Sequence, residues 1–409
     1  MQVIETECCI AGGGPAGIML GYLLARQGVD VIVVEKHKDF LRDFRGDTVH
    51  PSTMQVLHEL GLLEAFLKRD FQKTEQIGIN AGGRHYQMVD FSHLPTAAKF
   101  VAFMPQWEFL DFLASEVRKL PGFTLMMETR AERLTGRDGK VTGICASKDG
   151  EDFKIRAKVT VACDGRDSML REAGRLKLVQ QGAPIDVLWF RLPRNESEAS
   201  AESLGHIAKG GFLVSLNRGS YWQVALVIEK DGFGQVREHG IEAFRAKVAS
   251  IAPDLADAVQ TIEGFEDIKL LRVEVSRLRK WWRDGLLAIG DAAHAMSPVG
   301  GVGINLALQD AVAAARIIGP ALKDGSLSWS TLAKVQKRRE WPAEITQAVQ
   351  VFAHERVIMP AITGKSSGKA PLIVRLLDKV PILRRLPARA IGLGLRPEHW
   401  PKGLGQTGR

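Results

Sequence analysis

The amino-acid sequence predicts an α/β fold that carries an inserted, mainly antiparallel β-sheet and ends in a C-terminal helical segment. Three observations predict this arrangement. A β-branched run, a glycine-rich turn and an apolar helical pattern open the chain, and the same strand–turn–helix order returns at residues 158–174 and 285–318. Between those two segments lie alternating, aromatic-rich runs that are typical of antiparallel strands.

Length and composition limit the class of protein. The 409 residues suggest about two to three domains, and 45% hydrophobic with 25% charged residues is ordinary for a globular protein. Because the glycine-rich turn follows Met1 so closely, we expect no secretory leader. We also find no run of about 18 charge-free apolar residues, so we expect no membrane-spanning helix.

The four cysteines favour an intracellular chain without a metal site. Their spacing matches neither a zinc site nor a disulfide framework. We therefore expect no metal and a reducing, cytoplasmic location. The cysteines are Cys8, Cys9, Cys145 and Cys163.

The formal net charge is +8, and basic residues gather in the last third of the chain. No nucleic-acid-binding motif or row of interleaved aromatic residues accompanies them, so we expect no nucleic acid partner. Two interpretations of the basic face stay open: a solvated surface, or attraction to anionic lipid or an acidic partner. The oligomeric state is not predicted.

The first glycine motif is Gly12-x-Gly14-x-x-Gly17, and it stands between a buried strand and an apolar helix. The helix pattern stops at Gly28, and a β-branched run follows and ends in Glu35. Such a turn aims backbone N–H groups and a helix dipole at a pyrophosphate, and an acid at the next strand tip binds a ribose hydroxyl. The alternative is a tight turn without a ligand.

The same glycine spacing recurs at Gly403, Gly405 and Gly408. With 41 glycines in 409 residues, this spacing arises by chance about 0.4 times per chain, so the pattern alone is weak evidence. No strand precedes it and no helix has room to follow, so we predict a flexible tail there.

Two later segments extend the predicted nucleotide site. In "LLAIGDAAH", Gly290 and Asp291 end a strand, and "GGVGIN" then places the N–H groups of Gly303, Ile304 and Asn305 at a helix start. In "KVTVACDGRDS", Asp164 leaves another strand. It either belongs to the nucleotide site or caps the helix that follows, with Ser168 as the other capping candidate.

Two further residues are weaker candidates. Arg45 lies in the loop "DFRGDTVH", where an arginine is more often a plain surface residue, and Gln106 opens the helix "QWEFLDFLASEV".

Taken in order, these residues resemble the FAD-dependent aromatic hydroxylases of the para-hydroxybenzoate hydroxylase type, the class A flavoprotein monooxygenases. The resemblance covers roughly residues 3–345. It implies a Rossmann-like FAD-binding domain, FAD as cofactor, NADH or NADPH as transient co-substrate, and O₂. It further implies hydroxylation of an aromatic or polyketide- or quinone-like small molecule through a flavin C4a-hydroperoxide.

The resemblance also implies roles for individual residues. The first motif would hold the FAD pyrophosphate, Glu35 the adenosine ribose and Asp291 the ribityl chain. Arg45 and Gln106 would contact the phosphate and ribityl region, and Asp164 both FAD and the nicotinamide. The full predicted cofactor set is Gly12, Gly14, Pro15, Ala16, Gly17, Glu35, Arg45, Gln106, Asp164, Gly290, Asp291, Gly303, Ile304 and Asn305. No catalytic acid or base is assigned, and His294 is expected to be structural or to lie beside the flavin.

Residues 176–275 are the predicted substrate layer. Its aromatic and basic residues either line a pocket or pack the sheet. Where the family's para-hydroxybenzoate enzymes carry a hydroxyl residue after the proline, this chain has Val299, so we expect a larger or less acidic substrate than a benzoate. The candidate pocket residues are Trp189, Arg191, Tyr221, Trp222, Pro298 and Val299.

The domain boundaries follow from these assignments. We predict strands near residues 75–100 that join the substrate layer, and a basic, amphipathic C-terminal segment that either covers its own chain or touches a membrane. The predicted units are 1–175 and 276–345 for FAD, 176–275 for substrate, and 346–409 for the helical segment and tail.

Alternative reactions remain on the same fold. A double-bond reductase is one, and a halogenase is another, although the halogenase segment Trp-x-Trp-x-Ile-Pro is absent. A flavin-loaded membrane-surface protein without turnover is the third.

Overall fold

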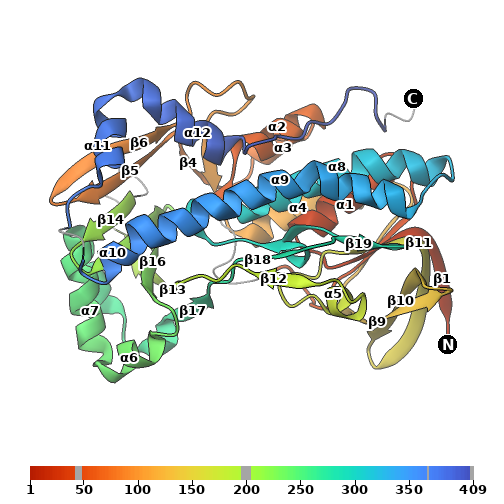
Figure 1. Ribbon diagram of the computed structural model, residues 1–409, viewed down its shortest axis with the longest axis horizontal. Coiled ribbons are helices and arrows are strands. Elements are labelled where there is room, and N and C mark those ends of the chain that lie inside the picture. Colours follow the sequence, from red (N-terminus) through yellow and green to blue (C-terminus); the bar gives the residue numbers. More distant parts are fainter. Residues whose placement is uncertain (42–47, 195–203, 366–367, 406–409) are drawn as a thin grey trace.

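The computed structural model describes residues 1–41, 48–194, 204–365 and 368–405. Two sheets lie at opposite ends of the molecule, and two long helices, α8 (Gly303–Lys323) and α9 (Trp329–Ala353), run side by side between them (Figure 1). The C-terminal helices lie along the top of this view, above the second sheet and α9.

The first sheet is the predicted Rossmann-like core. Its central strands β20, β11, β1, β2 and β8 are all parallel, and β19, β10 and β9 add antiparallel strands at its margin. The strands are β1 (Val3–Ala11), β2 (Val31–Val34), β8 (Phe123–Met126), β9 (Thr129–Arg137), β10 (Lys140–Lys148), β11 (Glu151–Ala162), β19 (Trp282–Arg283) and β20 (Leu286–Ala288).

The register of this sheet decides where the candidate site lies. Ala11, the last residue of β1, pairs with Val34 and with Ala162, and Ala162 pairs with Ala288. The carboxyl ends of four parallel strands therefore stop at one edge. Turns that leave this edge meet at one place, as expected for open α/β sheets.

One face of the sheet is covered by α1 (Pro15–Ala25), α4 (Gln106–Val117) and α8, which bury the largest apolar cluster. Apolar residues dominate α1 on all sides, and ten of its eleven residues are buried. The helix starts with Pro15 at its first turn, and Gly28, at φ +73°, follows its end as predicted. The opposite face packs on Trp281 and on β9 and β10.

The second sheet has seven strands, most of which come from the segment that the sequence analysis predicts as the substrate layer. The order is β17-β13-β16-β15-β14-β5-β6, and all pairs are antiparallel except β14 with β5. Its strands are β5 (Gln76–Ala81), β6 (Arg84–Asp90), β13 (Ile185–Pro193), β14 (Leu204–Ala208), β15 (Gly211–Asn217), β16 (Tyr221–Glu229) and β17 (Lys269–Arg272). Residues 76–90 thus contribute two strands to this layer from the N-terminal part of the chain.

The two faces of the second sheet differ in what covers them. Helices α6 (Phe233–Glu238) and α7 (Gly240–Ile251) pack on one face around Phe190 and Phe244. The other face packs on Val299 and on α10 (Met359–Ile362). This second face looks toward the start of α8.

Short elements connect these layers. Two three-stranded sheets consist of β3 (Thr48–Val49), β4 (Gln72–Thr74) and β7 (Val101–Phe103), and of β12 (Leu178–Gln180), β18 (Ser276–Leu278) and β21 (His294–Ala295). The short helices are α2 (Pro51–Glu59), α3 (Leu63–Leu67), α5 (Met169–Ala173), α11 (Leu372–Lys379) and α12 (Arg385–Gly392).

The C-terminal part differs from the prediction in two ways. Helix α9 runs without a break across the expected boundary at 345/346. The expected flexible tail is packed as far as it is described, because Trp400 is buried in the main apolar cluster and Gly405 lies against Arg26. Gly408 lies outside the described residues. Gly403 and Gly405, the described part of the second glycine motif, therefore belong to a C-terminal strap, residues 393–405, that packs on the FAD-binding part of the chain.

Within the described ranges, one helical segment, Val299–Lys323, has the length and hydropathy that crossing a membrane requires. Its most apolar window is 72% buried against other elements of the chain. This is the pattern of a core helix, and the segment contains α8.

Candidate functional site

The turn after β1 is closed toward the protein and open toward solvent. Gly12 has φ +106°, and a Cβ there would overlap the carbonyl of Cys163. A Cβ on Gly17 would overlap the carbonyl oxygen of Gly12. A Cβ on Gly14, in contrast, would meet no atom within 4 Å. The geometry thus needs glycine twice for packing, and it leaves free space at Gly14 where a phosphate can approach the backbone.

Glu35 follows β2 directly and points back to this turn. Its Oε2 accepts a hydrogen bond from the Gly13 N–H at 2.8 Å, and its Oε1 accepts one from the His37 N–H at 3.1 Å. The side chain is 11% exposed. The turn therefore orients the carboxylate before any ligand arrives.

The second and third predicted segments touch each other. Arg166 Nε donates to Asp291 Oδ2 at 3.2 Å, and both side chains are partly exposed. Asp291 sits in the 3₁₀ turn Gly290–Ala292, directly beyond β20. A Cβ on Gly290 would press on Ala16 and Ala307, so this turn lies between the starts of α1 and α8.

Asp164 takes the capping role that the sequence left open. Its carboxylate accepts hydrogen bonds from the Ser168 hydroxyl at 2.5 Å and the Leu170 N–H at 3.1 Å. Ser168 itself caps α5 by accepting from the Arg171 N–H. Burial raises the pKa of Asp164. The Asp164 side chain thus accepts hydrogen bonds at the helix start. Gly165 beside it faces open space, because a Cβ there would meet no atom within 4 Å.

The start of α8 is an uncapped helix N-terminus. Gly300 and Gly301 have φ of +81° and +62°, and no side chain caps the helix that begins at Gly303. Asn305 is buried, and its Oδ1 accepts hydrogen bonds from the hydroxyls of Ser52 and Thr53 at 3.2 and 2.5 Å. Free N–H groups at a helix start attract negative charge, so this end can stabilise an anionic ligand.

Of the two remaining cofactor candidates, the structure describes only Gln106. Arg45 lies outside the described residues. Gln106, part-buried, is the first residue of α4 and lies three positions after Phe103, which pairs with Thr48 across β3 and β7. Thr48 in turn donates a hydrogen bond to the carbonyl of Gly301 at 3.0 Å. The chain after Arg45 and the chain before Gln106 are thus joined next to the start of α8.

A buried charge network beneath the site was missed in the sequence. Asp310 accepts hydrogen bonds from the Gly290 N–H at 3.1 Å, from His294 Nε2 at 2.6 Å and from Arg339 Nε at 3.0 Å. Burial alone would raise the pKa of Asp310, but His294 and Arg339 hold it below its usual value. His294 is therefore a structural residue, as one of its two predicted roles states.

The network continues into the C-terminal strap. Glu398 is buried and pairs with Arg338, Arg316 and Arg339 at 2.6, 3.1 and 3.5 Å. Arg339 also donates to the carbonyl of Arg396 at 2.9 Å. The one signal available in the sequence was Asp310, the single acid in a mostly apolar helix.

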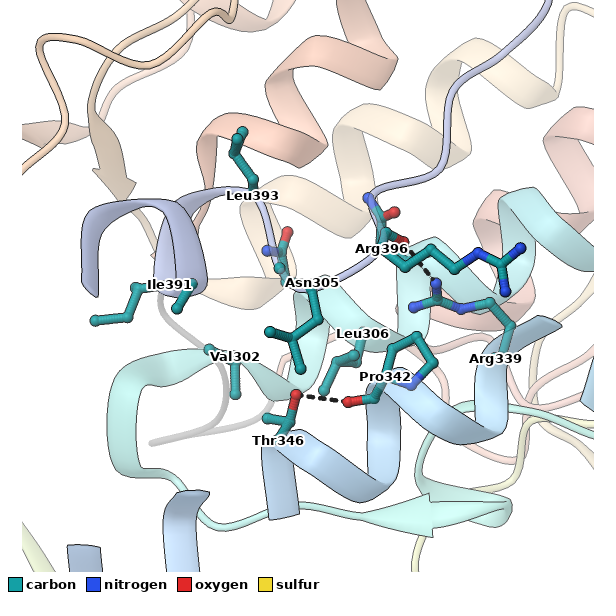
Figure 2. Close-up of a pocket in the computed structure, with 13 residues that line it drawn as sticks. Val302, Asn305, Leu306, Arg339, Pro342, Thr346, Ile391, Leu393 and Arg396 are labelled. Atoms are coloured by element: carbon teal, nitrogen blue, oxygen red, sulfur yellow. Dashed lines mark hydrogen bonds between the residues drawn. The ribbon is translucent and has the colours of Figure 1, made fainter. Parts of the chain in front are cut away.

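A cleft opens between the strap, α8 and α9 (Figure 2). Val302, Asn305 and Leu306 line it from the start of α8, and Pro342 and Thr346 line it from α9. Ile391 lines it from α12, and Leu393 and Arg396 line it from the strap. None of the predicted substrate residues contributes to its lining, so this cleft is separate from the substrate layer.

The structure divides the predicted substrate residues between two faces of the second sheet. Trp189 packs in the same apolar cluster as Val299, and its indole Nε1 is buried without a partner among the described residues. Arg191 stacks on Tyr221 at 5.2 Å from the ring centroid, and alternation places both on the face of Trp189. Trp222 is the exception. It is 5% exposed and packs with Phe190 under α7, because adjacent residues in a strand point to opposite faces.

Comparison with known proteins adds a family and a fold. The model of the FAD binding domain family matches residues 5–349. A relative from Streptomyces rimosus, 6-methylpretetramide 4-monooxygenase, is 32% identical over 98% of this chain and 96% of its own length. Protoasukamycin 4-monooxygenase from Streptomyces nodosus subsp. asukaensis is 24% identical over 79% of this chain and 81% of its own length.

Solved structures share the fold. PqsL from P. aeruginosa, crystallised with 2-aminobenzoylacetate, superposes with a TM-score of 0.76 at 22% identity, over 89% of this chain and 98% of its own. The p-nitrophenol 4-monooxygenase from Pseudomonas putida has a TM-score of 0.76 at 20% identity, over 95% of this chain and 97% of its own. The fold is thus that of flavoprotein monooxygenases.

Proposed function

Because this chain belongs to the FAD binding domain family and is an FAD-dependent monooxygenase, we propose that it hydroxylates an aromatic or polyketide-like small molecule. The reaction uses O₂, with NADH or NADPH as the reductant. The observation that carries the substrate class is the 32% identity to 6-methylpretetramide 4-monooxygenase over 98% of the chain, which includes the second sheet and the strap.

The residues at the edge of the first sheet fit FAD. Gly14 offers the pyrophosphate an approach free of side chains, and Glu35 offers a preoriented carboxylate to the adenosine ribose. Asp291, partly exposed beside Arg166, is available to the ribityl chain. The proposed cofactor set also includes Gly12, Pro15, Ala16, Gly17, Arg45, Gln106, Asp164, Gly290, Gly303, Ile304 and Asn305.

FAD, when bound and reduced, supplies the electrons that activate O₂ for transfer of one oxygen atom. The protein's own contribution is electrostatic and steric. The uncapped start of α8 would stabilise negative charge on a bound flavin, and the buried Asp310 fixes the turn that carries Asp291 by accepting a hydrogen bond from the Gly290 N–H. No side chain is assigned as a catalytic acid or base.

The substrate side is apolar with few polar groups. Val299 and Trp189 share one apolar cluster, and the buried indole N–H of Trp189 lacks an acceptor among the described residues. Such a surface suits a large aromatic ring system that brings a carbonyl or phenolic oxygen as acceptor. Arg191 and Tyr221, with Pro298, complete the proposed pocket, and Trp222 is excluded from it.

One assay tests the proposal. The purified protein is loaded with FAD, and NADH or NADPH oxidation and O₂ consumption are followed against phenols, quinone precursors and polycyclic aromatics. Substrate-stimulated oxidation with a product heavier by one oxygen atom is expected. Addition of hydrogen across a double bond without oxygen uptake would point to the reductase alternative instead. Failure to bind FAD at all would overturn the assignment.

We further propose a cytoplasmic location, in keeping with the free cysteines of the described chain. Contact of the C-terminal segment with a membrane surface is a separate proposal, and it concerns α11 and α12.

A further inference from the structure

Helices α11 and α12, with the 3₁₀ turn Pro381–Arg384 between them, form a ridge that exposes large aliphatic side chains. We call residues 372–392 the C-terminal ridge. Its exposed aliphatic residues are Leu372 (80% exposed), Ile373 (57%), Leu376 (47%), Ile382 (57%) and Leu386 (66%). Five large aliphatic side chains exposed within so short a segment are unusual on a folded surface and indicate an interaction.

The ridge cannot turn these side chains inward, because its other face is already used. Val374 packs with Ile79 in one apolar cluster, and Ala388 packs with Phe91 in another. Asp378 fixes the orientation further, since it accepts hydrogen bonds from Arg84 at 3.0 Å and from the Gln87 N–H at 3.1 Å on β6. Figure 1 shows α11 and α12 on the outside of the molecule, above β5 and β6. The aliphatic residues therefore face outward in the folded protein.

The exposed charged side chains of the C-terminal ridge are positive. Exposed cations alternate with the aliphatic residues along it, and they are Arg375, Lys379, Arg385 and Arg389. The single acid in the ridge, Asp378, is neutralised by Arg84 and by Arg384, at 3.0 and 3.9 Å. Its pKa is lowered, chiefly by the Gln87 N–H, so it stays a paired carboxylate at neutral pH.

We propose that the C-terminal ridge docks on the surface of an anionic lipid bilayer. Leucine and isoleucine enter the boundary of the acyl chains, while arginine and lysine extend to the phosphates at the same depth. Aliphatic and basic groups are mixed within one exposed row, and this mixture suits the bilayer boundary better than it suits an acidic protein or a nucleic acid. A protein groove would separate an apolar centre from a polar rim, and nucleic acid favours aromatic platforms, which the exposed row lacks.

The inference stands apart from the proposed reaction. Docking holds whether or not the substrate is aromatic, because it depends on the ridge alone. If both hold, the surface brings the enzyme to poorly soluble ring systems that partition into a membrane.

The test uses the full, FAD-loaded chain with two kinds of vesicle. Flotation with phosphatidylcholine vesicles that contain about 30% phosphatidylglycerol is compared with flotation on pure phosphatidylcholine. We expect binding to the anionic vesicles, little binding to the neutral ones, and loss of binding as the salt rises from about 0.1 to about 0.5 M. Absence of binding to anionic vesicles overturns the proposal, and so does equal binding to both.

Two variants and one control locate the surface. Reversal of the four exposed ridge cations to glutamate is expected to weaken binding by about 600-fold or more, because each of the four contributes about fivefold. The variant L372S/I373S/L376S is expected to lose about tenfold or more through lost apolar insertion. The control reverses four exposed cations of the β9–β10 hairpin, at the other end of the molecule in Figure 1: Arg130, Arg133, Arg137 and Lys140.

Unchanged flavin content and melting temperature show that each variant is folded, which the high exposure of the altered residues favours. The hairpin control is expected to bind as the parent does; equal loss in the control would reduce the effect to net charge and contradict the proposal. Light scattering in the absence of vesicles gives the remaining check. A dimer that L372S/I373S/L376S dissociates would assign the ridge to a second copy of the chain instead.

Discussion

The carboxylate of Glu35 accepts a hydrogen bond from the backbone N–H of Gly13 at 2.8 Å. The acid at the tip of β2 and the glycine turn after β1 are thus one structural unit, although 22 positions separate them in the chain. The Gly13 N–H orients the Glu35 carboxylate, and the carboxylate stabilises the conformation of the glycine turn.

Replacing Glu35 by alanine is expected to weaken FAD binding about 10- to 100-fold, because a hydrogen bond to a charged group contributes about 1.5–3 kcal/mol. Titration of the apoprotein with FAD, followed by flavin fluorescence, measures the change. Glu35→Gln keeps an acceptor oxygen and is expected to lose less. If alanine and the parent bind FAD equally, Glu35 does not contact the ribose.

Gly14→Val is expected to abolish retention of FAD without unfolding the protein. The new side chain meets no protein atom within 4 Å of its Cβ, and Gly14 has an ordinary φ of −74°, so the valine fills only the space proposed for the pyrophosphate. Gly234→Val is the matched control, since its Cβ also enters open space but lies on α6, which packs on the second sheet. Absorbance of bound flavin in the purified variants decides. Normal flavin content in Gly14→Val would refute the placement of the pyrophosphate.

Asp310→Asn is expected to destabilise the protein by about 3–5 kcal/mol, because it leaves the buried Arg339 and His294 without their shared carboxylate. Urea unfolding measured by circular dichroism gives the difference. Asp324→Asn, just beyond the end of the same helix, removes only an exposed carboxylate and is expected to have a much smaller effect. Comparable losses in the two variants would show that the buried network contributes no more than a surface acid.

Stability is expected to fall as the pH drops below about 6.5, because burial lowers the pKa of His50 and of His354. The unfolded chain then binds more protons than the folded one in the range between the lowered pKa and 6.5, so acid favours unfolding there. Above that range both states are neutral and the full stability is present. The check is the urea midpoint against pH. A variant His50→Gln should show a shallower decrease, and an unchanged profile would mean that His50 carries none of it.

How much of the site the sequence predicts depends on how local its contacts are. The turn of Gly12, Gly14 and Gly17 was predictable, because a strand, a helix and a β-branched run adjoin it within a few positions. Glu35 and Asp291 followed from strand ends, which parallel pairing brings to one edge.

Contacts between distant segments were not predictable in the same way. Glu398 pairs with Arg339 although 59 positions separate them, and the residues around neither of the two predict the pair. The burial of Trp400 is of the same kind, because it depends on packing against residues that are distant in the sequence. Trp222 is a different case. Strand alternation alone separates it from Tyr221, so its position was available from the sequence and the grouping of both residues in one pocket was wrong.

The opposite faces of the second sheet, with Trp189 on one and Trp222 on the other, allow the sharpest test of the substrate proposal. Trp189→Phe keeps the ring and removes the indole N–H, which is buried without an acceptor among the described residues, so it is expected to raise KM about three- to tenfold. FAD affinity should not change, because Trp189 lies in the second sheet. Trp222→Phe makes the same chemical change on the opposite face and is expected to leave KM unaltered. Steady-state kinetics with the substrate found in the oxygenation assay separate the two. Equal KM values in both variants would mean that the Trp189 N–H does not meet the substrate, and the face toward Val299 would then serve packing alone.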